Sequence, residues 1–153
     1  MKYTEGKNIM VYAQSADGAP VGAALETVSK AAELAKADGE EVIAVVFGKD
    51  TDAKSVIAAG ASRVLRTGEE GLQAAEKAQI IGKLAEKYQP KALYMAGTPE
   101  GKMIAPAVSA AFESGCVTDV TGITSDGVYT AFSYNGNVLN DMKTVSYTHL
   151  RAH

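Results

Sequence analysis

The sequence predicts an α/β fold, a three-layer α/β/α sandwich with a mostly parallel sheet and a C-terminal antiparallel extension. Between residues 9 and 112, short apolar runs of strand composition alternate with alanine-rich segments of helical spacing. Such alternation implies parallel strands joined by right-handed crossovers, with helices on both faces of the sheet. Beyond residue 116 the helical spacing stops, and turn signals separate β-rich runs, which predicts antiparallel pairing.

The first predicted strand covers residues 9–13, the apolar run IMVYA, and a turn of small residues follows at 15–20. The helix after it carries apolar residues at steps of four and three, which places them on one face. These residues are Val21, Leu25, Val28, Ala32 and Ala35. Gly39 is expected to end this helix as a left-handed cap.

The clearest strand is residues 41–47, EVIAVVF, whose near-continuous apolar composition is typical of a strand covered on both faces. Thr51 or Asp52 can then cap a short helix near residues 53–59. Residues 63–66, RVLR, are expected to form the third strand.

A third helix and a fourth strand complete the alternating part of the chain. The helix is predicted from apolar residues at helical spacing and ends before Pro90. Its apolar residues are Ala75, Ala78, Ile81, Ala85 and Tyr88. Residues 92–96 follow as a strand, which gives the order βαβαβαβ expected of a Rossmann-like sheet.

The loop GTPEGK at 97–102 connects the fourth strand to the next helix. Ligands of parallel α/β sheets bind beyond such strand ends, so Gly97, Thr98, Gly101 and Lys102 are the candidate binding residues. Close backbone approach at the glycines, the N–H groups of a helix start and the charge of Lys102 suit a phosphate or carboxylate. No P-loop or Gly-x-Gly-x-x-Gly pattern is present, however, and we favour the alternative of a structural turn and subunit contact.

Pro106 sets the expected start of the fourth helix. A proline deep inside a helix removes a hydrogen bond and clashes with the preceding turn, at a cost of about 3 kcal/mol. We therefore expect Pro106 in the first turn of a helix that begins near Lys102 or Met103 and runs to about Ser114.

Composition and charge exclude several functional classes. The 153 residues are enough for one domain, and a net charge of −3 without a basic stripe gives no sign of nucleic-acid binding. No window is apolar enough to insert into a membrane. Cys116 is the single cysteine, and His149 and His153 are the only histidines. We therefore expect no metal site and no catalytic residues, since His-based triads and His/Cys zinc sites need more such side chains.

The C-terminal part of the chain has a different character. Residues 117–124 and 128–134 have strand composition, and the Asp-Gly pair at 126–127 predicts a hairpin turn between them. We expect a domain over residues 1–140 and an irregular tail over 141–153, where SYTHLRAH shows no periodicity. Our hypothesis is that this tail reflects a truncation or an artefact.

Three segments, taken in order, resemble one family. They are GTPEGKMIAPAVSAAF at 97–112, Val-Thr-Asp-Val at 117–120 and Tyr-Asn-Gly-Asn at 134–137. Over roughly residues 8–140 the chain is similar to the N-terminal domain of electron-transfer flavoprotein α subunits, within the adenine-nucleotide α-hydrolase-like superfamily. The family pattern has arginine at two positions that are Lys102 and Ala107 here.

The resemblance implies an electron carrier rather than an enzyme. In this family a C-terminal domain of the α subunit mainly holds the FAD, so this chain alone is expected to bind none and to have an empty nucleotide site. The implied role is a scaffold that contacts the β subunit in a heterodimer serving dehydrogenases and a downstream acceptor. The implied location is the cytoplasm, or the mitochondrial matrix in a eukaryote.

A second functional class stays open. A stand-alone adenine-nucleotide-binding protein of the universal-stress type would share the predicted fold. Its phosphate loop, Gly-x-x-Gly followed nine residues later by Gly-Ser/Thr, is absent after the fourth strand. Calorimetry with AMP and ATP would separate the two classes.

Overall fold

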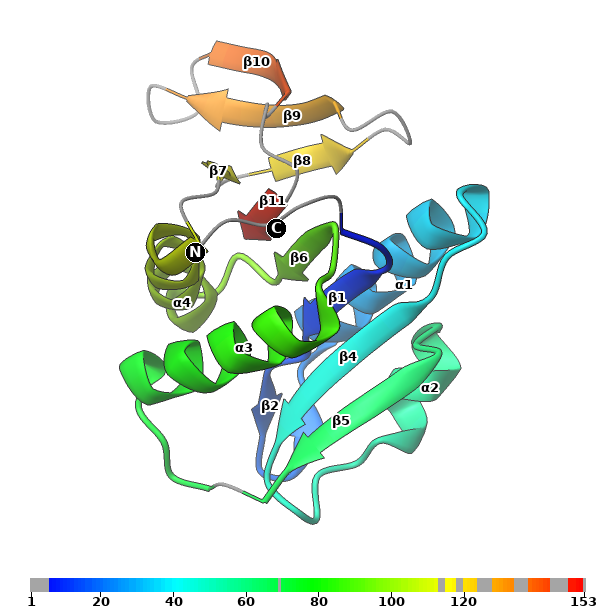
Figure 1. The fold of residues 1–153 in the computed structure, drawn as a ribbon, viewed down its shortest axis with the longest axis vertical. Helices are drawn as coiled ribbons and strands as arrows, with labels where there is room; N and C mark the ends of the chain where they lie inside the picture. Colours follow the sequence, from blue (N-terminus) through cyan, green and yellow to red (C-terminus); the bar gives the residue numbers. More distant parts are fainter. Residues whose placement is uncertain are drawn as a thin grey trace.

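A parallel sheet forms the centre of the molecule (Figure 1). The computed structural model describes residues 6–68, 70–112, 115–117, 120–123, 128–133, 138–143 and 149–152. Within them the sheet has six strands: β1 (Ile9–Tyr12), β4 (Val42–Phe47), β5 (Arg63–Thr67), β6 (Ala92–Met95), β7 (Gly115–Val117) and β11 (His149–Ala152). Their order is β5-β4-β1-β6-β11-β7, and every neighbouring pair is parallel.

Helices cover both faces of this sheet, which confirms the predicted three-layer sandwich. The helices are α1 (Gly22–Ala37), α2 (Lys54–Ala59), α3 (Ala74–Tyr88) and α4 (Pro99–Phe112). Helices α1 and α2 pack on one face, and α3 and α4 lie side by side on the other. Asp52 caps α2 as expected, because its carboxylate accepts hydrogen bonds from the backbone N–H groups of Lys54 and Ser55.

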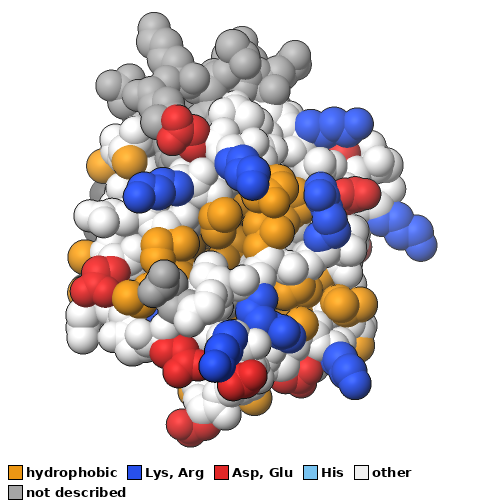
Figure 2. Space-filling view, turned by 60° about the horizontal axis from the view of Figure 1, so that its bottom comes forward, with side chains coloured by type: hydrophobic (Ala, Val, Ile, Leu, Met, Phe, Trp, Pro, Cys, Tyr) orange, Lys and Arg blue, Asp and Glu red, His pale blue; other side chains and the backbone are white. Residues whose placement is uncertain are grey.

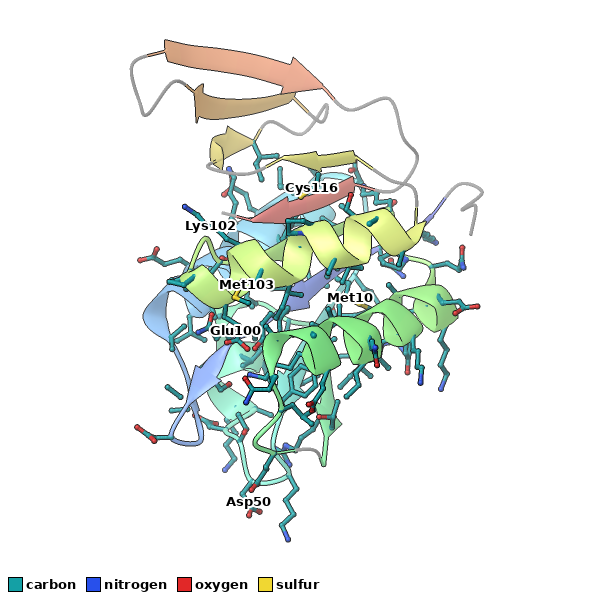
Figure 3. All side chains as sticks on the ribbon, turned by 90° about the vertical axis from the view of Figure 1, so that its left-hand side faces the viewer. Met10, Asp50, Glu100, Lys102, Met103 and Cys116 are labelled. Atoms are coloured by element: carbon teal, nitrogen blue, oxygen red, sulfur yellow. The ribbon has the colours of Figure 1, made fainter. Side chains whose placement is uncertain are left out.

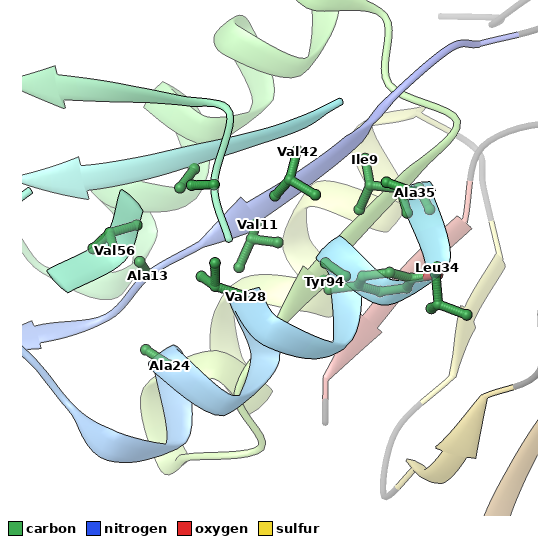
Figure 4. Packing of buried hydrophobic residues seen from close by; sticks show 14 of the residues in the cluster. Ile9, Val11, Ala13, Ala24, Val28, Leu34, Ala35, Val42, Val56 and Tyr94 are labelled. Atoms are coloured by element: carbon green, nitrogen blue, oxygen red, sulfur yellow. The ribbon is translucent and has the colours of Figure 1, made fainter. Parts of the chain in front are cut away.

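Strands β1, β4 and β6 are buried on both faces of the sheet, since successive side chains of a strand point to opposite sides. In β1, Ile9 and Val11 pack toward α1, while Met10 and Tyr12 pack toward α3 and α4. Figure 4 shows the first of these two cores, where Val28 of α1 packs against the sheet. Full burial of each such aliphatic side chain contributes about 1.5–3 kcal/mol to folding.

Two small antiparallel sheets complete the described structure. Strands β8 (Val120–Ile123), β9 (Val128–Ser133) and β10 (Val138–Lys143) form the predicted C-terminal extension. Strands β2 (Ser15–Ala16) and β3 (Ala19–Pro20) form a short hairpin after β1. The turn expected at 126–127 lies outside the described residues.

The expected start of α4 was wrong. The helix begins at Pro99 rather than near Lys102 or Met103, so Pro106 lies inside it. Pro99 occupies the first helical position, where a proline is favoured because its missing N–H would have no helical partner. Local capping at this position outweighs the cost of the second proline, whose ring faces solvent.

The expectation of an irregular tail over residues 141–153 was also wrong, because the described residues of this range lie in strands. Residues 141–143 belong to β10, and β11 pairs in parallel with β6 on one side and β7 on the other. Neighbouring strands therefore define β11, although its sequence has no strand pattern. The predicted boundary at residue 140, and the proposed truncation, stay predictions.

Candidate functional site

The strand order of the central sheet reverses beside β1. The chain moves from β1 outward to β4 and β5, and then returns to place β6 on the other side of β1. In doubly wound sheets the crevice at the carboxyl ends of two such strands is where ligands bind. The residues that follow β1 and β6 therefore form the candidate site.

Thr98 connects the two loops at this crevice. Its hydroxyl donates a hydrogen bond to the side-chain carbonyl of Gln14, which follows β1, at 2.5 Å. The same hydroxyl accepts a hydrogen bond from the backbone N–H of Gly101 at 3.1 Å, as expected of a residue that caps a helix. Thr98 thus uses both hydrogen-bonding functions of its hydroxyl within the protein.

Gly101 is required by close packing. A Cβ atom added there would collide with the backbone carbonyl oxygen of Ala96 at the end of β6. The first turn of α4 therefore rests directly on the strand end, which only glycine permits. This contact supports the interpretation that the loop is a tight structural turn.

The other two candidate residues lie apart from this contact. Gly97 is exposed at the tip of the turn, and Lys102 is exposed on α4. Figure 3 shows Lys102 on the opposite side of α4 from Glu100. The structure thus brings Thr98 and Gly101 together but leaves the Lys102 ammonium away from the crevice, and ligand binding by these four residues stays a prediction.

A polar cluster that the sequence did not reveal lies at the same edge of the sheet. The Glu100 carboxylate, in the first turn of α4, accepts hydrogen bonds from the Tyr12 hydroxyl at 3.2 Å and the Lys77 ammonium at 2.5 Å. The Lys77 and Glu100 side chains are only 17% and 22% exposed. The cluster therefore links β1, α3 and α4 through a largely buried ion pair.

The Phe47 ring borders this cluster. The Phe47 ring, at the end of β4, contacts the Tyr12 ring edge to face at 5.7 Å and lies 5.7 Å from the Lys77 ammonium. Burial raises the pKa of the Tyr12 hydroxyl well above its usual range, and the charge of Glu100 and its hydrogen bond raise it further. Tyr12 therefore stays protonated and acts as a hydrogen-bond donor.

A cleft of about 340 Å³ opens beyond the ends of β1 and β4. Its lining includes Asp17, Asp50 and Glu70, and these carboxylates have no ion pair among the described residues. Lys77 is the single basic residue of the lining, and it is already paired with Glu100. The cleft therefore disfavours an anionic ligand such as a phosphate.

The remaining reactive side chains of the described residues suggest no chemistry. Cys116 is half-buried, and burial raises the pKa of its thiol, which lowers its reactivity. No three His, Cys, Asp or Glu side chains of the described ranges are grouped so as to hold a metal ion. No helix in that part of the chain is long and apolar enough to cross a membrane.

Fold and site together define a doubly wound α/β domain whose crevice is occupied by its own side chains. Comparison with known families then identifies the family. The chain belongs to the electron transfer flavoprotein family, whose domain model matches residues 9–150. The family resemblance found in the sequence is thereby confirmed.

Two relatives show which subunit the chain is similar to. The electron transfer flavoprotein subunit alpha of Clostridium acetobutylicum is 28% identical over 131 residues, which cover 82% of this chain and 39% of the relative. The subunit alpha of Thermoanaerobacterium thermosaccharolyticum is 27% identical over 146 residues, covering 90% of this chain and 44% of the relative. The chain thus spans less than half the length of the curated relatives that it matches.

Proposed function

We propose that this chain provides the N-terminal domain of an electron-transfer flavoprotein α subunit. Its role is to act as a scaffold and to contact a β subunit, within a carrier that takes electrons from dehydrogenases to a downstream acceptor. The observation that carries this proposal is the family match over residues 9–150, together with two relatives that are both α subunits.

In this proposal the chain itself holds no FAD, and a further domain mainly supplies the flavin site. Two features of the crevice support this role. Thr98 and Gln14 bond to each other across the position where a ligand would enter. The neighbouring cleft carries three unpaired carboxylates, which would repel the phosphates of a dinucleotide. The chain therefore contributes structure rather than chemistry.

Reconstitution tests the proposal. The full-length gene product, coexpressed with its β subunit, should purify as a yellow heterodimer whose flavin absorbance bleaches on reduction by a dehydrogenase. The 153-residue chain, purified alone and mixed with FAD, should stay colourless after desalting. A colourless full-length product that does not associate with the β subunit would count against the whole assignment.

A stand-alone nucleotide-binding protein is the second candidate function. Calorimetry of the isolated chain with AMP and with ATP separates it from the first. We expect no heat of binding, because the loop after β6 is only three residues long before α4 begins. Clear saturable binding of either nucleotide would favour the second candidate.

A further inference from the structure

The two donors that hold the Glu100 carboxylate have the geometry of a small anion site. The Tyr12 hydroxyl and the Lys77 ammonium both donate to the same oxygen, Oε1 of Glu100, at 3.2 and 2.5 Å. The Lys77 ammonium also lies 3.5 Å from the Tyr12 hydroxyl. A charged and a neutral donor that converge on one oxygen suit a carboxylate, because each adds a hydrogen bond to the anion.

Packing against Phe47 positions both donors independently of Glu100. Tyr12 is 1% exposed, and its ring meets the Phe47 ring edge to face. The Lys77 ammonium lies 5.7 Å from the centre of the same ring, within the range of a cation–π contact. We therefore expect the donors to keep their positions when the carboxylate that they hold is removed, which is the condition for a preorganised site.

The cleft beyond the ends of β1 and β4 gives solvent a route to these donors, since Tyr12 and Lys77 both line it. Figure 2 shows this end of the molecule, where acidic and basic side chains are interspersed. Figure 3 shows Asp50, one of the cleft carboxylates, well away from Glu100. A small solute can therefore reach the two donors through the cleft.

We propose that Tyr12 and Lys77 form a binding site for a small carboxylate, and that the chain itself supplies the ligand as the Glu100 side chain. The site takes a free monocarboxylate when Glu100 is shortened to alanine. Acetate matches the part that is lost, since Glu100→Ala removes one methylene group and one carboxylate. The proposal does not rest on the electron-carrier function proposed above.

The charges around the site set the expected affinity. Loss of Glu100 leaves the largely buried Lys77 ammonium without its counter-charge, which is strongly unfavourable, and a free carboxylate restores the pair. A ligand as small as acetate binds weakly, and the carboxylates of the cleft lower its affinity further. We therefore expect a dissociation constant on the order of 10 mM for acetate.

Thermal unfolding of Glu100→Ala, with acetate compared with chloride at equal ionic strength, tests the proposal. At ten times the dissociation constant, acetate should raise the ratio of folded to unfolded protein about elevenfold, which raises the melting temperature by roughly 3–6 °C. The shift should saturate with concentration. Acetamide, the neutral analogue of acetate, should give no shift. The wild type should not respond to acetate, because Glu100 fills the site.

Two further variants separate a built site from a general response to anions. Adding Lys77→Met to Glu100→Ala should abolish the acetate shift, because the charged donor is lost. Glu40→Ala is the matched control, since Glu40 is a carboxylate of similar burial, 15% exposed, that pairs with Lys91 at 2.9 Å. Lys91 keeps its second partner, Asp38, at 2.7 Å, so acetate should not stabilise this variant.

A direct measurement of binding complements the melting curves. The carbon NMR signal of isotope-labelled acetate should broaden with Glu100→Ala and stay sharp with the wild type. If Glu100→Ala is unfolded in chloride, refolding from urea in acetate should recover its circular dichroism. Failure to fold in either salt would overturn the proposal, because the donors would then depend on Glu100. Equal shifts with acetate and chloride, or an acetate shift that survives Lys77→Met or appears equally in the wild type or Glu40→Ala, would overturn it as well.

Discussion

The Thr98 hydroxyl is the most heavily used single group at the crevice. It caps α4 by accepting from Gly101, and it closes the crevice by donating to Gln14. Because the hydroxyl proton is already donated within the protein, Thr98 has no proton left to donate to a ligand. The residue that first suggested a binding site is therefore better explained as a structural cap.

Thr98→Val should measure this structural contribution. Valine keeps the shape of the side chain but removes both hydrogen bonds, so we expect a loss of about 1–2 kcal/mol in the free energy of unfolding by urea. Thr98→Ser keeps the hydroxyl and should cost less than about 0.5 kcal/mol. Equal stabilities of the two variants would show that the hydroxyl contributes nothing.

Tyr12→Phe should remove part of the decrease in folding stability that the wild type shows at alkaline pH. The pKa of Tyr12 is raised from an ordinary value of 10.0, so the unfolded chain releases this proton at a lower pH than the folded chain does. The contribution of protonated Tyr12 is therefore complete below pH 10.0 and declines above it, by about 1.4 kcal/mol per pH unit.

Urea unfolding on both sides of this pH measures the effect. The wild type should lose more stability with rising pH than Tyr12→Phe does. Tyr88→Phe, which removes a tyrosine outside the cluster, should keep the wild-type slope. Identical pH slopes for the wild type and Tyr12→Phe would contradict the buried, hydrogen-bonded hydroxyl.

At the scale of elements, the close packing of α4 on the end of β6 depends on the absence of a side chain at Gly101. Gly101→Ala should destabilise the protein by about 1–3 kcal/mol, because the new methyl group would overlap the Ala96 carbonyl. Gly22→Ala is the matched control, since nothing lies near the added methyl group at the start of α1. For Gly22→Ala we expect the free energy of unfolding, measured by thermal unfolding, to increase by about 0.5 kcal/mol. A Gly101→Ala protein as stable as the control would show that α4 shifts freely on β6.

Most elements could be predicted because their local pattern agrees with the fold. The apolar run at 41–47 and the spacing of Val21, Val28 and Ala35 each fit one structure, and the structure has β4 and α1 there. The start of α4 could not be predicted, because two prolines compete and the cap at Thr98 depends on its position beside β1. The general cost of an internal proline therefore led to an expected helix start that was three to four residues too late.

The polar cluster could not be predicted for a different reason. Tyr12, Lys77 and Glu100 come from three elements far apart in the chain, and no motif joins them. The available signal was positional: Tyr12 ends a strand, and the other two lie in the first turns of helices. In a parallel sheet these positions meet at one edge, but spacing alone does not show which side chains touch.

At the scale of the whole molecule, the chain leaves the small antiparallel sheet and returns to the large parallel one as its second-to-last strand. Strand β11 fills the position between β6 and β7, with Leu150 opposite both Leu93 and Cys116. Without it, β6 would become an edge strand with unpaired backbone groups. The last described residues therefore join the edge strand β7 to the rest of the parallel sheet.

Deletion of residues 144–153 tests this role of β11. If the strand completes the sheet, the shortened chain loses the hydrogen bonds on one side of β6, at about 1 kcal/mol each, and exposes apolar surface. That loss is a large share of the roughly 5–15 kcal/mol that stabilise a domain, so we expect a much lower melting temperature and aggregation. Leu150→Pro in the complete chain should act in the same direction, because a proline cannot donate within a central strand. If both proteins melt like the wild type, the pairing of β11 adds nothing to the stability of the sheet.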